Sequence, residues 1–184
     1  MKNLIFFLIL ASGLLLTSCG SEPAAEEPLS QDKLTELLLA LEGTLQEQKD
    51  QPRVDSATVR TLTDRAEEYA RRFPQDTLTP KFLFQAASAS RGIGDFEKSA
   101  ALWGSIAAGY DNYQRAPDAL FLQALTLDEN LQDTARARQQ YEAFLARYPK
   151  HPLANDARIL LEAARSGKSA NDLVEEFRQQ QNDE

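Results

Sequence analysis

Few side chains in this sequence have the chemistry that catalysis or metal binding requires. The chain contains one cysteine, Cys19, and one histidine, His151. A thiol nucleophile needs a neighbouring base, and a zinc site needs several Cys or His ligands, so neither residue has the partners it would require. His151 stands between two prolines, and we expect it to be a turn residue. We therefore predict no catalytic residue, no metal and no cofactor.

Two further patterns have a chemical interpretation, but a structural one fits them better. Gly92 and Gly94 form a Gly-x-Gly that follows a predicted helix rather than a strand. Such a pair is typical of a helix C-cap and turn, not of a phosphate loop. The adjacent carboxylates of Glu67 and Glu68 are expected on the solvated face of a helix and do not indicate acid–base chemistry. The chain is predicted not to be an enzyme.

The residues that precede Cys19 suggest a different role for its thiol. Lys2 is followed by the apolar residues 4–11 and 14–16, and small residues come next. A charged start, an apolar run and small residues at its end are the features of a secretory signal peptide. The run is shorter than the roughly 20 residues of a transmembrane helix. We predict that residues 1–18 are a signal peptide.

Leu16-Thr17-Ser18-Cys19 resembles the lipobox of bacterial lipoproteins, which consists of an aliphatic residue, two small residues and cysteine. The resemblance implies cleavage before Cys19, a diacylglycerol on its thiol and a further acyl chain, such as palmitate, on the new amine. Each buried CH₂ contributes about 0.8 kcal/mol, so two or more acyl chains anchor a protein stably. The alternative, a core cysteine in an N-terminal helix, does not explain why the chain becomes polar at this residue.

Residues 19–30 are expected to form a disordered linker. This stretch is rich in Pro and Glu and poor in apolar residues, a composition that does not form a core. Fully extended, it would span roughly 40 Å. The remaining residues, 31–184, have the length of one domain. The formal net charge of −8 argues against nucleic acid as a partner.

The domain is expected to be all-α. Ala, Leu, Glu, Gln and Arg, which favour helices, dominate after residue 30. Leucines at helical spacing predict a first helix that ends before Pro52, and a second helix is predicted from Asp55 or Ser56 to Phe73-Pro74. The leucines are Leu34, Leu37, Leu38, Leu41 and Leu45.

The chain then repeats itself with a period of 38 residues. A fixed period of this size indicates a helical solenoid, in which each helix pair needs its neighbours to bury its apolar face. A coiled coil, the competing model, would be interrupted by prolines. The matched positions are residues 82–87 with 120–125, Asp95 with Asp133, and Trp103 with Tyr141. Trp103 and Tyr141 are expected to be core residues.

Residues 94–100, Gly-Asp-Phe-Glu-Lys-Ser-Ala, are similar to the inter-helix turn of tetratricopeptide repeats. Trp103 and Ile106 fall where that family has packing residues, whereas the second copy of the turn, around Gln132, lacks the glycine and the aromatic residue. The resemblance covers residues 55–165. It implies a solenoid of about three to four helical hairpins, and we expect residues 171–177 to form a short capping helix.

The join between repeats resembles a subclass of that family. The segment Tyr148-Pro149-Lys150-His151-Pro152, with Ala154 and Ala157 after it, is similar to joins in the BamD type of outer-membrane assembly lipoprotein. It is also similar to joins in the tetratricopeptide part of the Tol-Pal-associated division coordinator. The resemblance implies a part in outer-membrane assembly or in coordination of the envelope during division.

In the tetratricopeptide family the first helix of each hairpin lines a concave groove that grips partner segments. Carried over to this sequence, the family positions imply a partner-binding groove. Its lining would be Lys81, Phe84, Ser88, Arg91, Leu122, Thr126 and Glu129. The alternative, that these residues simply pack or face solvent, is open, and Phe84 and Leu122 are the two closest to a core position.

These inferences predict a lipid-anchored scaffold or adaptor that binds other envelope proteins through its groove. The alternative is a ligand- or glycan-binding accessory lipoprotein of an uptake system, which the scarcity of aromatic residues for stacking sugars disfavours. Gly20 stands where the enteric inner-membrane retention signal has aspartate, so we expect the outer membrane. Glu22, Glu26 and Glu27 resemble acidic export signals of surface lipoproteins, so both a periplasmic and a surface-facing position are open.

Overall fold

Every regular element that the structure describes is a helix. The computed structural model describes residues 28–48, 55–167 and 178–179, and no strand occurs among them. The all-α prediction is confirmed. The predicted signal peptide, Cys19 and the predicted capping helix at 171–177 lie outside the described residues. The elements are α1 (Gln31–Glu47), α2 (Ser56–Arg72), α3 (Thr79–Gly92), α4 (Phe96–Gly109), α5 (Ala116–Leu125), the π-helix η1 (Thr126–Asn130), α6 (Thr134–Arg147) and α7 (Ala154–Ser166).

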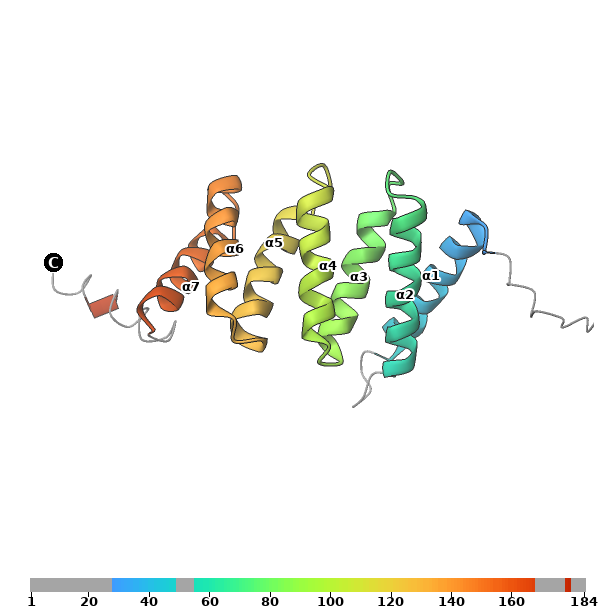
Figure 1. Cartoon of the computed structure of the whole chain (residues 1–184), viewed down its shortest axis with the longest axis horizontal. Coiled ribbons are helices and arrows are strands. Elements are labelled where there is room, and N and C mark those ends of the chain that lie inside the picture. The colour runs from blue at the N-terminus through green and yellow to red at the C-terminus, as the bar shows by residue number, and fades with distance from the viewer. Residues whose placement is uncertain (1–27, 49–54, 168–177, 180–184) are drawn as a thin grey trace, which may run out of the picture.

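The helices form an elongated stack in which each packs chiefly against its neighbours in sequence. Figure 1 shows α2, α4 and α6 upright and nearly parallel, with α1, α3, α5 and α7 tilted against them. Helices α1 and α7 lie at opposite ends of the stack (Figure 1). Residues from α1, α3 and α5 therefore share one long side of the molecule, and residues from α2, α4 and α6 share the other.

Three aspartates start helices at equivalent places. Asp55, Asp95 and Asp133 are the N-caps of α2, α4 and α6, and each carboxylate accepts a backbone N–H of the first turn. Such a cap stabilises a helix by about 1 kcal/mol because it satisfies a donor that the helix leaves open. The predicted caps at Asp95 and Asp133 are confirmed, and the second helix begins after Asp55, one of the two starts that the sequence allowed.

An aromatic residue ends each of these three helices in nearly the same backbone conformation. The φ and ψ angles are −130° and 55° at Phe73, −135° and 57° at Tyr110, and −131° and 54° at Tyr148. In each case the backbone N–H donates to the carbonyl four residues earlier. The repeat in the sequence is therefore also a repeat of backbone geometry.

The turn before α6 holds one residue in a strained conformation. Gly94, before Asp95, has a φ of 82°, and Gln132, at the equivalent place before Asp133, has a φ of 54°. This region suits glycine and costs a residue with a Cβ about 1 kcal/mol or more. We expect Gln132→Gly to raise the free energy of unfolding by about 0.5–1 kcal/mol in urea denaturation.

The matched control is the reverse substitution one repeat earlier. A Cβ at Gly94 would meet no atom within 4 Å, so Gly94→Gln tests the backbone conformation alone. It should lower the free energy of unfolding by a similar amount. A Gln132→Gly variant less stable than the parent chain would contradict the assigned strain.

Aromatic side chains lie in the middle of each of the two adjoining parts of the core. Trp103 is 1% exposed and Tyr141 is 0% exposed, which confirms both as core residues. The first part, between α1 and α4 and reaching α5, contains Tyr69, Phe82, Phe84 and Trp103, and the second, between α4 and α7, contains Phe121, Tyr141 and Phe144.

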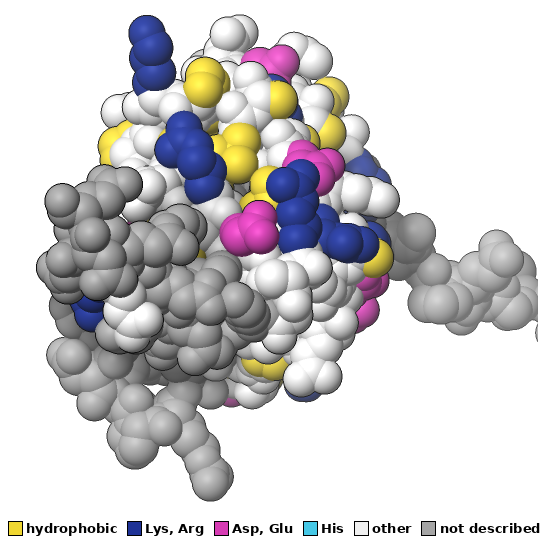
Figure 2. Space-filling model, turned by 90° about the vertical axis from the view of Figure 1, so that its left-hand side faces the viewer, with side chains coloured by type: hydrophobic (Ala, Val, Ile, Leu, Met, Phe, Trp, Pro, Cys, Tyr) yellow, Lys and Arg dark blue, Asp and Glu magenta, His cyan; other side chains and the backbone are white. Residues whose placement is uncertain are grey.

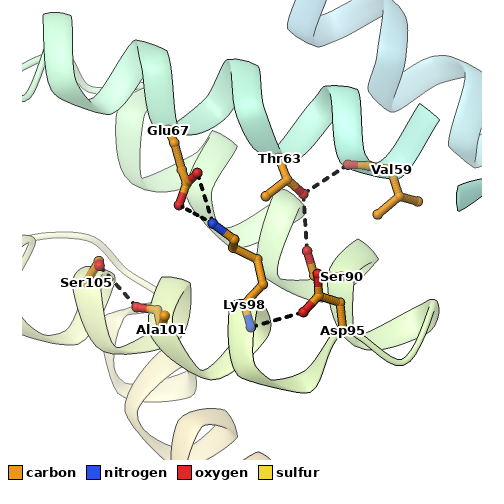
Figure 3. A network of polar contacts seen from close by, with 8 residues as sticks. All are labelled: Val59, Thr63, Glu67, Ser90, Asp95, Lys98, Ala101 and Ser105. Atoms are coloured by element: carbon orange, nitrogen blue, oxygen red, sulfur yellow. Dashed lines mark hydrogen bonds and ion pairs between the residues drawn. The ribbon is translucent and has the colours of Figure 1, made fainter. Parts of the chain in front are cut away.

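Polar contacts join α2 to the two helices that follow it (Figure 3). The Lys98 ammonium of α4 donates to both carboxylate oxygens of Glu67 at 3.0 Å and 3.1 Å, and the Thr63 and Ser90 hydroxyls lie 3.1 Å apart. The side chain of Glu67 is 32% exposed and that of Glu68 is 16% exposed. These two carboxylates are thus partly shielded by ion pairs, rather than free on a solvated face as the sequence suggested.

The α7 end of the stack has a mixed surface. Figure 2 looks at this end and shows apolar side chains scattered among basic and acidic ones. Ile159, Leu160 and Ala163 of α7 are half-buried, and the Arg165 guanidinium lies 2.7 Å from the Glu142 carboxylate of α6. This end is therefore not uniformly apolar in the part that the structure describes.

Candidate partner-binding groove

Helix α3 and the α5–η1 segment carry all seven residues that were predicted to line a groove. They occupy equivalent places in successive repeats, with three- or four-residue spacing that puts them on one side of each helix. Lys81, Phe84, Ser88 and Arg91 are on α3, Leu122 is on α5, and Thr126 and Glu129 are on η1.

Lys81 is held at the edge of this side by a residue of α1. Its ammonium lies 3.4 Å from Oε2 of Glu42, and the side chain is 39% exposed. The same ammonium lies 5.5 Å from the centre of the Phe82 ring. Lys81 therefore links α3 to α1 and still presents part of its side chain to solvent.

Two of the seven side chains are buried. Phe84 is 3% exposed and Thr126 is 0% exposed. The Phe84 ring packs edge-on against Trp103 at 4.4 Å, and the Arg115 guanidinium covers it at 3.6 Å from its centre. The Thr126 hydroxyl donates to the carbonyl of Leu122 at 2.7 Å. Phe84 and Thr126 support the groove from within and offer little surface to a partner.

Arg91 joins α3 to η1 across the space between them. Its Nε donates to Oδ1 of Asn130 at 3.4 Å, and its Nη2 lies 3.7 Å from the Glu129 carboxylate. Both contacts are long, and the Arg91 side chain is 34% exposed. Ser88, one turn before Arg91, is exposed, and its hydroxyl donates to the Phe84 carbonyl at 3.0 Å.

Two cavities lie side by side here and share a wall at Ser88 and Gly92. One, between α1 and α3, measures about 520 Å³, and the other, between α3 and α5–η1, about 480 Å³. We call the two together the central groove. The first cavity is also lined by Leu39, Glu42 and Leu45, and the second by Arg91, Trp103, Leu122 and Asn130.

Sequence reasoning missed the part of the groove that α1 supplies. Leu39 is 46% exposed and is the one large apolar side chain that is exposed among the described residues. It lies outside the leucine stripe that packs α1 against the core, and this was the available signal. The resemblance to tetratricopeptide repeats begins only at residue 55, so it implies no groove position on α1, where Leu39 and Glu42 lie.

The π-helix η1 contains a shielded carboxylate. Burial raises the pKa of Asp128, although the hydrogen bond from the Tyr141 hydroxyl, at 3.5 Å, opposes this shift. Burial also raises the pKa of Tyr141, and the nearby Asp128 and Glu129 carboxylates add to the effect. A neutral phenol beside a partly buried carboxylate suits packing better than proton transfer near neutral pH.

A larger cavity of about 720 Å³ lies on the other long side, between α2 and α4. Its lining combines apolar side chains such as Ala70, Leu102 and Ala108 with the polar side chains of Glu67, Arg71, Gln75 and Ser105. Two of its polar side chains, Glu67 and Ser105, already bond Lys98 and the Ala101 carbonyl (Figure 3), and none of the seven predicted groove residues lines it. The central groove is therefore the better candidate site.

The chain matches no protein-family model, no curated protein and no solved structure. Among the described residues, no group of His, Cys, Asp and Glu is arranged to hold a metal ion. No helix in the same residues has the length and apolar character to cross a membrane. The central groove and the lipobox-like sequence that ends at Cys19 are therefore the two features that point to a function.

Proposed function

We propose that this protein is a lipid-anchored scaffold or adaptor of the cell envelope, attached to the outer membrane, that holds segments of other envelope proteins in the central groove. The observation that carries the proposal is the pair of adjoining cavities at Ser88 and Gly92. Their apolar walls, Leu39 and Leu122, are flanked by charged side chains, a combination that suits a polypeptide better than a small ion.

We further propose that the stack of helices is a tetratricopeptide-like solenoid. The equivalent aspartate caps at Asp95 and Asp133 and the equivalent helix ends at Tyr110 and Tyr148 support this assignment. In such a solenoid each hairpin adds to one extended binding surface. The lipobox-like sequence that ends at Cys19 supports the anchor.

The test is crosslinking in living cells with a C-terminally tagged chain, followed by mass spectrometry of the captured proteins. We expect a small, reproducible set of envelope proteins. The double variant Lys81→Glu, Arg91→Glu places one carboxylate beside Glu42 and another beside Glu129. The repulsion within each pair should open these contacts, alter the groove and weaken binding of the segment. Recovery of the set should fall by about ten-fold, the effect of roughly 1.4 kcal/mol of binding free energy.

The control is a charge reversal of equal size away from the groove. Arg138 on α6 and Lys150 in the following turn are exposed, and Arg138→Glu, Lys150→Glu should leave recovery unchanged. Both double variants should have the helical circular dichroism of the parent chain. Equal recovery with the two double variants would contradict the groove assignment. If no envelope protein is recovered above an untagged strain, the glycan-binding alternative would replace the scaffold.

A further inference from the structure

His151 is the one histidine of the chain, and it lies in the turn between α6 and α7. Its side chain is 23% exposed. The Leu153 N–H donates to Nδ1 of the ring at 3.3 Å, so Nδ1 carries no proton. The ring proton is then on Nε2, which lies 3.6 Å from Oδ1 of Asp118 on α5. The structure thus holds His151 as a neutral imidazole, with each nitrogen beside a polar group.

Asp118 connects this ring to the side chain that covers Phe84. Its second carboxylate oxygen, Oδ2, accepts the Nε–H of Arg115 at 3.1 Å. The Arg115 guanidinium lies 3.6 Å from the centre of the Phe84 ring. Phe84 in turn packs edge-on against Trp103 at 4.4 Å between ring centres. A continuous row of contacts therefore runs from the turn before α7 to the core between α3 and α4.

A second proton on His151 would disturb this arrangement. Nδ1 would become a donor facing the Leu153 N–H, and the hydrogen bond between them would be lost. Leu153 is the N-cap of α7, where free backbone N–H groups already concentrate positive charge. On the other side of the ring, the Asp118 carboxylate attracts the charged form. A charged ring is therefore drawn away from α7 and toward Asp118.

The remaining surroundings of the ring do not compensate a positive charge. On α6 the ring meets the edge of Phe144, at 5.5 Å between ring centres and 86° between ring planes. Asp118 is the one carboxylate within ion-pair distance of the ring among the described residues. The other charged or titratable side chains of the adjoining segments form no ion pair or hydrogen bond with it in the same residues; they are Arg147, Tyr148, Lys150, Asp156 and Arg158.

We propose that protonation of His151 draws Asp118 away from Arg115 and so loosens the cover over Phe84. The side chains of Arg115 and Asp118 are 50% and 32% exposed. Ion pairs as exposed as this are weak, so a second cation beside Asp118 competes with Arg115 for the carboxylate. Imidazoles gain a proton between about pH 5 and 8. Arg115 therefore lies over Phe84 when His151 is neutral and withdraws when His151 is charged, and this device needs neither the lipid anchor nor a bound partner.

Nuclear magnetic resonance can follow both ends of this row of contacts. The chain has one histidine and one tryptophan, so it gives one imidazole signal and one indole N–H signal. Both are recorded from about pH 8 to about pH 5 on the full-length chain in detergent micelles, without a histidine tag. Because Trp103 contacts Phe84, its indole signal should shift with the same midpoint as the His151 signal. An indole signal that stays in place while His151 titrates would overturn the proposal.

Two variants separate this coupling from a general effect of acid. His151→Asn keeps an acceptor for the Leu153 N–H, since asparagine bonds the backbone two residues on, but it cannot gain the proton. The indole shift should be lost. Asp118→Asn retains the histidine and removes the charge between it and Arg115, so His151 should still titrate and the indole signal should no longer follow it.

Both variants should have the helical circular dichroism of the parent chain. An indole shift of the parent's size in either variant would reject the row of contacts through Asp118. The shift would then belong to another acidic group, such as Asp128, whose pKa is raised by burial.

Discussion

Replacing Phe144 by alanine is expected to lower the free energy of unfolding by about 3–5 kcal/mol. Phe144 is fully buried on α6. Its ring contacts Phe121 of α5 at 5.6 Å, Tyr148 at 5.7 Å and His151 at 5.5 Å between ring centres. A single side chain thus connects α5, α6 and the turn that leads into α7. The loss includes both the burial of the ring and the cavity that it leaves.

Urea denaturation followed by circular dichroism measures this change. A small domain has a total stability of roughly 5–15 kcal/mol, so the Phe144→Ala variant should be close to its unfolding threshold at 37 °C. Leu39→Ala is the control, because Leu39 is 46% exposed and its truncation should cost under about 1 kcal/mol. A cost below about 1 kcal/mol for Phe144→Ala would show that the second part of the core is not packed as described.

Cys19→Ser is expected to release the protein from the membrane. The variant retains residues 1–18 and so the proposed export signal, but it has no thiol to carry a lipid. Without acyl chains the anchoring free energy is lost, since each buried CH₂ contributes about 0.8 kcal/mol. Nearly all of the protein should then move from the detergent phase to the aqueous phase in a detergent partition, unless the uncleaved signal peptide retains it.

An alkyne-labelled palmitate distinguishes these two outcomes. The parent chain should incorporate the label, and Cys19→Ser should incorporate none, whichever fraction holds it. Ser21→Ala, two residues beyond the cysteine, leaves the lipobox-like sequence intact and should be labelled like the parent chain. Labelling of the Cys19→Ser variant would rule out Cys19 as the lipid attachment site.

The helices and their order could be predicted from the sequence because the forces that set them act locally. Asp95 and Asp133 cap helices through backbone groups within three residues of themselves. The start of each of these helices can therefore be predicted from a few adjacent residues. The 38-residue period was visible because each repeat places the same residue types against its neighbours. The end of α1 at Glu47 was less well defined, since Pro52 sets only the farthest point that the helix can reach.

The groove was predicted in part. The repeat positions of Ser88 and Arg91 put them on the correct side of α3, because a side chain's direction follows from its place on the helix. Burial does not follow in the same way. Phe84 shares that side but is covered by Arg115, which comes from the turn after the next helix. The spacing of residues within α3 cannot predict this contact.

The helical fold, the caps at Asp95 and Asp133, the repeat and the residues that share one side of a helix follow from the sequence, because capping, helix propensity and helical spacing depend on neighbours along the chain. The π-helix η1 was not predicted. Only the packing of the helices shows which of those residues are covered and that α1 contributes Leu39 and Glu42 to the groove. These features depend on distances between atoms of α1, α3, α4 and α5, and such distances exist only once the helices have packed.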